Sequence, residues 1–402
     1  MNAPAGKSVD FSGVSLDEAL ERARALVPVL RERAPQAEAR RSMLPETEAD
    51  LHRSGLFRFM QPKRYGGMEL DLPAFFEIPA VLGRGCASTA WNVSNLGAHH
   101  WTLALFDARA QHDVWGDNPD ALIASGIAYP QGRARPVEGG YMLSGRWNFS
   151  SGVDVSEWNQ LSAMVREGER VVDYRMCLLH KSQYEIVDDW HVLGMRSTGS
   201  KTVVANDVFV PAYRAVCMTE ARGGTKFAGA PVSTGPLFHV PLAAIGGLGL
   251  AGAGVGNAEA ALELAVAMVK ERSTSYTAAK MRDFQAVQLR IGTAASKIDT
   301  AKLVMRDVAA EAQDIARRGG VPDMQTKLRY RRDVAYGANL CVEAVDIVHA
   351  MAGANGIYDS QPLQRMFRDA HALGAHISFS YDAQVSAWGM AALGGEVHNP
   401  TL

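Results

Sequence analysis

The sequence predicts an α+β protein, mainly α-helical, with an N-terminal helical domain (1–118), a small central β-barrel (119–221) and a C-terminal four-helix bundle (234–402). Two changes of hydrophobic period carry this prediction. Apolar residues recur every three or four positions in the first region, alternate with polar residues in the second, and return to helical spacing in the third. With 402 residues, of which 47% are hydrophobic and 21% charged, the composition is globular and excludes a disordered or fibrous chain.

In the first region, helices are expected over 15–33, from Pro45 to Gly55, from Pro73 to Gly83 and over 88–106, because apolar residues follow the helical period there. Pro28 lies inside the first of these and is a candidate for a kink.

In the second region, strands are expected over 141–149, 160–165, 174–179 and 203–211, with Gly- and Ser-rich turn signals between them. Several short strands of this kind are typical of a small barrel or a sandwich, and the barrel is the form predicted here.

In the third region, four long helical segments are expected, over 246–272, 284–318, 325–351 and 363–393. Long helices joined by short links favour an up-down bundle.

Composition also excludes several function classes. The 41 Lys+Arg against 43 Asp+Glu give a net charge of -2, with no basic excess for nucleic acid. The cysteines are too far apart for a disulfide scaffold or a zinc site: Cys86, Cys177, Cys217 and Cys341. The N-terminus lacks a signal peptide, and the stretch 241–256 is too weakly apolar to span a bilayer. A soluble cytoplasmic protein without a membrane partner is expected.

The segment Gly247–Gly252 matches the spacing G-x-G-x-x-G. A dinucleotide site would need a preceding strand and a βαβ unit, and neither pattern is present. Small residues that let two helices approach closely are the better interpretation.

The adjacent pair His99 and His100 is unsuited to a shared metal, since neighbours on a helix point about 100° apart. One of the two could face a pocket as a proton acceptor. The segment Asn148–Gly152 has two interpretations. It is either the turn at the end of a strand, or a set of hydroxyl and backbone N–H groups that could bind a flat heteroaromatic ring. Arg272 and Tyr276, one turn apart, could bind and cover a phosphate or form a solvated helix end.

Five further segments, taken together, carry a resemblance over nearly the whole chain: Gly55–Gly67, Ala87–Trp91, Leu193–Ser200, Asp207–Pro211 and Gln364–His371. They resemble the acyl-CoA dehydrogenase superfold. Within it, the chain is similar to the reduced-flavin-dependent aromatic hydroxylases, the oxygenase components of two-component flavin monooxygenases of the 4-hydroxyphenylacetate 3-hydroxylase and secosteroid phenol hydroxylase type.

One segment favours the hydroxylases over the dehydrogenases. Acyl-CoA dehydrogenases commonly carry Tyr-Glu-Gly-Thr after Arg-Asp-Ala, where the Glu removes a proton. Here the segment is Ala375–Ser378, and apolar Ile377 cannot accept a proton. The resemblance implies that His376 acts there instead. An acyl-CoA dehydrogenase with tightly bound FAD stays the alternative, because some members place the Glu on another helix. A non-catalytic helical scaffold is a third hypothesis.

The resemblance implies two overlapping sets of site residues. The catalytic residues are His99, Ser125, Ser151 and His376. The cofactor-binding residues are Trp91, Ser125, Ser150, Ser151, Arg272, Tyr276 and Gly353. No metal site is expected. His99 with Ser125 would polarise the substrate O–H or N–H, while Ser151 and His376 would lie at the reacting edge of the flavin.

The resemblance also implies the reaction. Reduced FMN or FAD comes from a separate NAD(P)H:flavin reductase, O2 is the co-substrate, and a C4a-hydroperoxyflavin hydroxylates the ring. A homotetramer is implied, with Arg272 and Tyr276 reaching the flavin of a neighbouring subunit. Hydroxyphenylacetate hydroxylases have Arg and Tyr at the positions aligned with Ala243 and Ser378. This larger, less polar pocket favours a bulkier or neutral phenolic, indole or fused-ring substrate.

Overall fold

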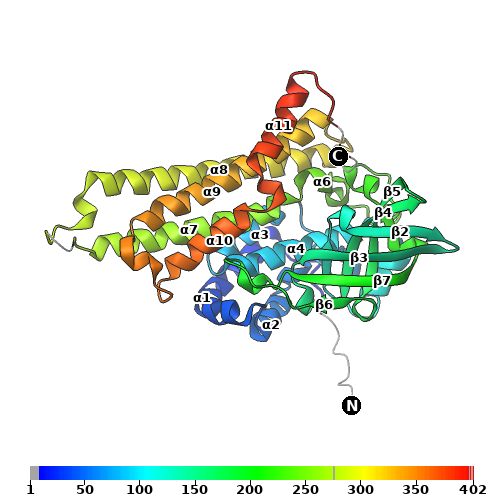
Figure 1. The fold of residues 1–402 in the computed structure, drawn as a ribbon, viewed down its shortest axis with the longest axis horizontal. Helices are drawn as coiled ribbons and strands as arrows, with labels where there is room; N and C mark the ends of the chain where they lie inside the picture. Colours follow the sequence, from blue (N-terminus) through cyan, green and yellow to red (C-terminus); the bar gives the residue numbers. More distant parts are fainter. Residues whose placement is uncertain (1–8, 275–276, 398, 400–401) are drawn as a thin grey trace, which may run out of the picture.

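The computed structural model describes residues 9–274, 277–397, 399 and 402, and Figure 1 shows it as a ribbon. Five helices form the N-terminal part: α1 (Leu16–Arg40), α2 (Pro45–Ser54), α3 (Pro73–Gly83), α4 (Ala87–Leu103) and α5 (Ala108–Trp115). The helix predicted over 15–33 is therefore longer than expected. It begins at a capping box formed by Ser15 and Glu18 and continues past Pro28 and Pro35.

One mixed sheet follows, built from eight strands: β1 (Ile123–Gly126), β2 (Gly132–Val137), β3 (Gly140–Ser150), β4 (Trp158–Glu167), β5 (Arg170–His180), β6 (Glu185–Val187), β7 (Lys201–Pro211) and β8 (Ala215–Cys217). The order is β6-β7-β3-β2-β4-β5-β8, and β1 pairs parallel with β4. The predicted barrel is wrong in one respect, because the sheet is open. Its two edge strands, β6 and β8, span three residues each and pair only inward.

Three long helices, α7 (Gly247–Glu271), α8 (Gln285–Arg317) and α9 (Met324–Ala350), extend away from the sheet in Figure 1. They match three of the four predicted segments. The fourth, predicted as one helix over 363–393, is divided into α10 (Pro362–Gly374) and α11 (Tyr381–Ala392). Between them the 3-10 turn η12 (Ile377–Phe379) begins where the His376 ring accepts the Ser378 N–H, at 3.2 Å. The break matters because it carries a predicted site residue.

The glycines at the start of α7 do let helices approach closely, as predicted. A Cβ added at Gly249 would lie 2.3 Å from Ser94 Oγ of α4, and one at Gly252 would lie 2.5 Å from Phe76 O of α3. This contact lies within one chain, and it fixes α4 against the helical core. Within the described residues, none of the helices has the length and apolarity needed to cross a membrane.

Replacing Gly256 with alanine is expected to destabilise the fold by about 1–3 kcal/mol, because the new methyl carbon would lie 2.2 Å from Ala80 O. Gly292→Ala is the matched control, since its added Cβ meets no atom within 4 Å on α8. The control should gain up to about 1 kcal/mol. Urea unfolding curves measure both. Equal midpoints for the two variants would contradict the close approach of α7 and α3.

Candidate active site

Three predicted site residues from distant parts of the sequence lie together between α4, the end of β3 and the α10–α11 break. Trp91 Nε1–H donates to Ser151 Oγ at 3.1 Å. The Trp91 and His376 rings meet edge to face, with centroids 5.4 Å apart and an interplanar angle of 78°. Trp91 and Ser151 are buried, and His376 is partly buried. We call these three residues the indole–serine–imidazole cluster.

A local irregularity of β3 directs Ser151 into this cluster. The register with β7 shifts between Trp147 and Ser150, and Phe149 takes a positive φ of 65° with its side chain exposed. Ser150 Oγ instead accepts a hydrogen bond from Asn159 Nδ2 at 3.0 Å, inside the sheet. Of the two adjacent serines, Ser151 therefore belongs to the cluster and Ser150 does not.

Two hydroxyls that the sequence analysis did not single out extend the cluster. Ser151 Oγ lies 2.7 Å from Ser200 Oγ, which lies 2.6 Å from Thr198 Oγ1. Thr198 in turn donates to Met195 O at 2.9 Å. Both hydroxyls belong to the segment Leu193–Ser200, which carried the resemblance. That motif was the signal that could have identified them.

The same segment is anchored to α10 by a buried carboxylate. Met195, at φ 54°, donates its N–H to Asp369 Oδ1 at 2.6 Å. Next to it, Arg368 Nη1 donates to Leu193 O at 2.7 Å, and a Cβ at Gly194 would lie 2.2 Å from Arg368 O. Burial raises the pKa of Asp369 to about 6, although the Met195 N–H opposes that rise. Asp369 thus acts on the cluster through the segment it holds.

Asp369→Ala is expected to lower the yield of product per reduced flavin several-fold, because the Thr198 and Ser200 hydroxyls lose their support. Asp369→Asn keeps an oxygen acceptor for Met195 and should retain most of the yield. The yield measurement would contradict the positioning role if the two variants behaved alike.

Asp369 also makes stability depend on pH. Its pKa is higher in the folded chain than in the unfolded chain, so its contribution is complete below about pH 4 and is lost as pH rises through about 6. A shift of that size corresponds to roughly 3 kcal/mol. Urea unfolding from pH 4 to 8 should show this decline in the wild type and a flatter profile in Asp369→Asn.

His99 is oriented as a proton acceptor. Its Nδ1 lies 2.7 Å from Ile123 O, and because a carbonyl only accepts, Nδ1 carries the hydrogen. Burial lowers the pKa of His99 to about 4, so the ring is neutral near pH 7 and Nε2 keeps a free lone pair. Ser125 lies two residues after Ile123 on β1, opposite Gln160, whose Nε2 donates to His99 O at 3.1 Å. His99 and Ser125 share the α4–β1 contact, although no hydrogen bond joins these two described side chains.

The other member of the histidine pair has a different environment. His100 is fully buried, with Nε2 3.3 Å from Ala121 O and burial lowering its pKa to about 3. Its ring meets Trp115 edge to face. His100 therefore packs in the interior, and His99 is the member of the pair suited to proton transfer.

His376 has the opposite tautomer. Its Nδ1 accepts the Ser378 N–H, and burial lowers its pKa to about 4, so a neutral ring carries its hydrogen on Nε2 as a donor. Ile377 beside it is 67% exposed. His376, not Ile377, is thus the residue of this segment that faces Trp91.

The remaining cofactor residues lie elsewhere. Arg272 Nη1 donates to Met351 O at 3.2 Å and to Ala352 O at 2.7 Å, directly before Gly353, which has φ 57°. Tyr276 lies outside the described residues.

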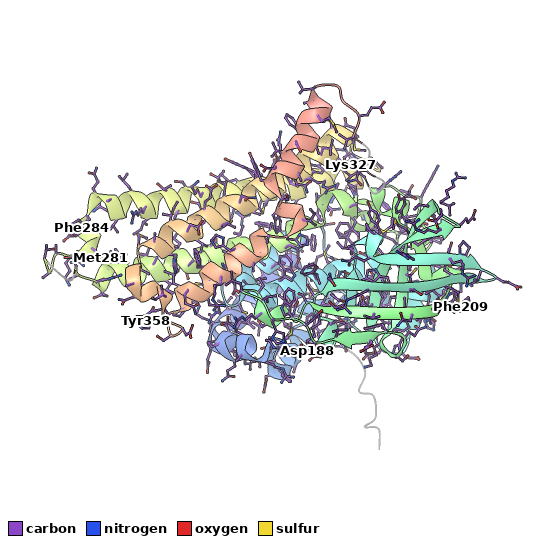
Figure 2. All side chains as sticks on the ribbon, viewed as in Figure 1. Asp188, Phe209, Met281, Phe284, Lys327 and Tyr358 are labelled. Carbon is purple, nitrogen blue, oxygen red and sulfur yellow. The ribbon has the colours of Figure 1, made fainter. Side chains whose placement is uncertain are left out.

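Arg272 lies at the end of the long helices that is away from the sheet. Its carbonyl accepts the Met281 N–H at 3.0 Å, and Figure 2 labels Met281 at the end of the long helices away from the sheet. One chain therefore presents two groups of predicted flavin contacts: the indole–serine–imidazole cluster and the Arg272–Gly353 pair.

The cluster fits the ring of a reduced flavin, whose edge carries both N–H donors and carbonyl acceptors. Because Thr198 donates to Met195 O, the hydrogens of Ser200 and Ser151 are used along the hydroxyl chain, so both oxygens are left as acceptors. His376 Nε2–H can donate. One buried acceptor beside this segment, Asn92 Oδ1, has no partner among the described residues, while Asn92 Nδ2 donates to Thr198 O at 3.2 Å. A ring with N–H groups would satisfy such acceptors.

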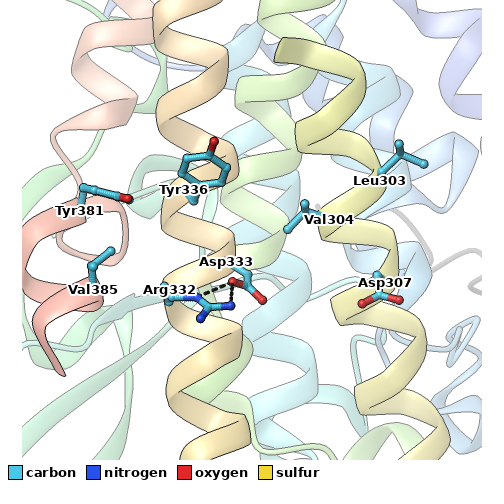
Figure 3. A pocket seen from close by; sticks show the side chains of 8 residues that line it. All are labelled: Leu303, Val304, Asp307, Arg332, Asp333, Tyr336, Tyr381 and Val385. Atoms are coloured by element: carbon cyan, nitrogen blue, oxygen red, sulfur yellow. Dashed lines mark hydrogen bonds and ion pairs between the residues drawn. The ribbon is translucent and has the colours of Figure 1, made fainter. Parts of the chain in front are cut away.

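Two other features of the described chain are not part of this cluster. A groove between α8, α9 and α11 (Figure 3) has lining residues of its own: Leu303, Val304, Asp307, Arg332, Asp333, Tyr336, Tyr381 and Val385. Within the described residues, no three His, Cys, Asp or Glu side chains are arranged to hold a metal ion.

Comparison with known proteins gives consistent relatives. Residues 248–381 match the family model "Acyl-CoA dehydrogenase, C-terminal domain". The chain is 34% identical over 358 residues to the flavin-dependent monooxygenase oxygenase subunit HsaA of Rhodococcus jostii, covering 89% of this chain and 93% of that protein. It is 36% identical over 386 residues to the oxygenase component of the FADH(2)-dependent resorcinol hydroxylase of a Rhizobium species, covering 93% and 94%.

Two solved structures are similar over almost the whole chain. The 3-HSA hydroxylase from Rhodococcus sp. RHA1 superposes with a TM-score of 0.90 at 32% identity, covering 96% of this chain and 99% of that one. XiaF from a Streptomyces species, solved with FADH2 and glycerol, gives a TM-score of 0.89 at 28% identity, covering 96% and 98%.

Proposed function

Because the chain belongs to the oxygenase components of two-component flavin-dependent monooxygenases, with an acyl-CoA dehydrogenase-like fold, we propose that its indole–serine–imidazole cluster holds the reacting ring of the flavin. The protein is an oxidoreductase that hydroxylates an aromatic substrate with O2 and reduced flavin supplied by a separate reductase. The observation that carries the proposal is the hydrogen bond from Trp91 to Ser151 beside His376.

The bound reduced flavin supplies the oxygen chemistry, and the protein orients it and keeps water out. Ser151 is held by Trp91 on one side and Ser200 on the other, so its hydroxyl has a fixed position. His376 offers Nε2–H as a neutral donor at the ring edge. Neutral donors suit this role because they stabilise developing negative charge without giving up a proton to it.

His99 is proposed to act on the substrate. Its Nε2 lone pair accepts the hydrogen of a phenol O–H or an indole N–H, and Ser125 on β1 binds the same group. Withdrawing that hydrogen raises electron density on the ring carbon that is hydroxylated. A phenolic, indole or fused-ring compound is the proposed substrate class.

The Arg272–Gly353 pair, with Tyr276, is proposed to bind the phosphate of a flavin, either FMN or FAD, held by a neighbouring copy. Support comes from its separation from the ring-binding cluster and from the fixed orientation of Arg272. A homotetramer is the proposed assembly, since each chain would complete another chain's site.

The function is tested by adding chemically reduced FAD or FMN, without any reductase, to the protein under air. Resorcinol, 4-hydroxyphenylacetate and indole serve as substrates, and mass spectrometry measures the products. Hydroxylated product above the protein-free control is expected. The acyl-CoA dehydrogenase would be established instead by two results together. H2O2 would be the only product with each aromatic substrate, and an acyl-CoA thioester would bleach protein-bound FAD.

A further inference from the structure

One face of α9 carries a cation among buried neighbours. Residues three and four apart lie on the same side of a helix, which places Lys327, Leu328, Val334 and Ala335 around Arg331. These four neighbours are buried, and Arg331 is itself partly buried. Arg331 therefore points into the protein from α9, yet it keeps some accessible surface.

The face of α9 that carries Arg331 lies near the segment of the candidate active site that contains Ser378. At one end, Lys327, labelled in Figure 2, donates from Nζ to Arg222 O at 2.8 Å. At the other end, Val334 comes within 3.5 Å of the point where a Gly247 Cβ would lie, and Ser378 Cβ lies 2.9 Å from the same point. Val334 and Ser378 thus converge on the first residue of α7.

The face of α9 that carries Arg331 thus also carries Val334, which lies next to the segment containing Ser378. Ser378 donates its N–H to His376, which faces Trp91 in the indole–serine–imidazole cluster. Arg331 lies about one helical turn, roughly 5 Å along the axis, before Val334 on the same face. A guanidinium on a long side chain spans such a distance easily.

Arg331 also differs from the other arginines of this part of α9. Arg329 pairs with Glu311. Arg332 pairs with Asp333 at 2.6 Å, and dashed lines mark this ion pair in Figure 3. The Arg331 guanidinium makes no hydrogen bond or ion pair with any residue that the structure describes. Burial alone lowers its pKa, with no carboxylate opposing that effect. A partly buried charge without a counter-ion is costly, unless a ligand supplies the anion.

We infer that Arg331 binds a carboxylate carried by the aromatic substrate. The inference rests on the proposed function and deepens it, because it specifies an acidic aromatic compound. Guanidinium and carboxylate form paired, parallel hydrogen bonds, so the contact would also fix the orientation of the ring relative to His99. The small residues Ala243 and Ser378 had suggested a bulkier or neutral substrate. Arg331 reaches the same region from α9 and restores a positive charge to it.

The test compares an acid with its uncharged amide. Dissociation constants of 4-hydroxyphenylacetate and 4-hydroxyphenylacetamide are measured by calorimetry with the flavin-loaded protein, for wild type and Arg331→Met. Wild type should bind the acid more tightly. Arg331→Met should weaken binding of the acid by about 10- to 100-fold and change binding of the amide by less than about twofold. Arg331→Lys should lie between the two.

Arg332→Met is the matched control, because it removes an adjacent charge that is already paired with Asp333 and lines the groove outside the site. It should change neither dissociation constant. A wild type that does not prefer the acid would overturn the inference, as would equal losses for acid and amide in Arg331→Met.

A change of oligomeric mass in Arg331→Met would also overturn it, since the counter-charge would then belong to another copy of the chain. Hydroxylation separates this failure from failure of the proposed function. If wild type hydroxylates the amide as well as the acid, only the role of Arg331 is lost. If neither is hydroxylated with reduced flavin under air, the proposed function fails too.

Discussion

His99→Ala is expected to lower the rate of hydroxylation by about 10²–10⁴-fold while reduced flavin and O2 are still consumed. The variant removes the Nε2 lone pair that Ile123 O orients, but it leaves Trp91, Ser151 and His376 in place. Oxygen should then appear as H2O2 instead of hydroxylated product. Product and peroxide are measured together in single-turnover reactions started with reduced flavin.

The same histidine fixes the pH dependence of the rate. Because burial holds its pKa near 4, His99 is already neutral at pH 6 and above, and the rate should not change there on its account. The rate should fall only as pH drops through about 4, when Nε2 becomes protonated. Unchanged product yield in His99→Ala, or a rate that rises on acidification, would contradict the acceptor role.

Ser151→Ala is expected to have the second-largest effect, lowering product per reduced flavin by about 10²-fold or more. The substitution removes the acceptor of the Trp91 N–H and the partner of Ser200. It therefore leaves a buried indole N–H unsatisfied and a hydroxyl chain without its end. Flavin affinity, measured by equilibrium dialysis, should weaken in parallel.

Ser144→Ala is the matched control for this variant. Ser144 lies on the same strand, β3, and its hydroxyl donates to Asp207 Oδ1 at 3.1 Å on the surface. Its loss should leave product yield and flavin affinity unchanged. If Ser151→Ala matched this control, the indole–serine–imidazole cluster would not hold the flavin.

Elements with strong local signals could be predicted from the sequence. The helices from Pro45 and from Pro73 to Gly83 begin at the predicted prolines, because proline at the first helical position leaves no unpaired N–H. The break between α10 and α11 was missed, because residues 363–393 keep a helical period and the turn is stabilised by a side chain, His376. Closure of the sheet was predicted wrongly, since strand pairing at the edges leaves no local pattern.

The residues of the candidate site also divide into those that the sequence indicated and those that it did not. The resemblance implied Trp91, Ser151 and His376 as site residues, and the structure brings these three side chains together. Asp369 lies in the resembling segment Gln364–His371 but was not singled out, because its role depends on a contact with Met195, 174 residues away in sequence. Arg331 could not be predicted as a site residue either. A charged side chain at a helical position is expected to face solvent, unless its burial and its lack of a partner are known.

The origin of the inserted oxygen atom tests the central claim most directly. We mix the protein under 18O2 with chemically reduced flavin and the best aromatic substrate of the series. Mass spectrometry then measures the mass of the product. The account predicts one atom of 18O in each new hydroxyl group. A hydroxyl that carries oxygen from water would contradict it.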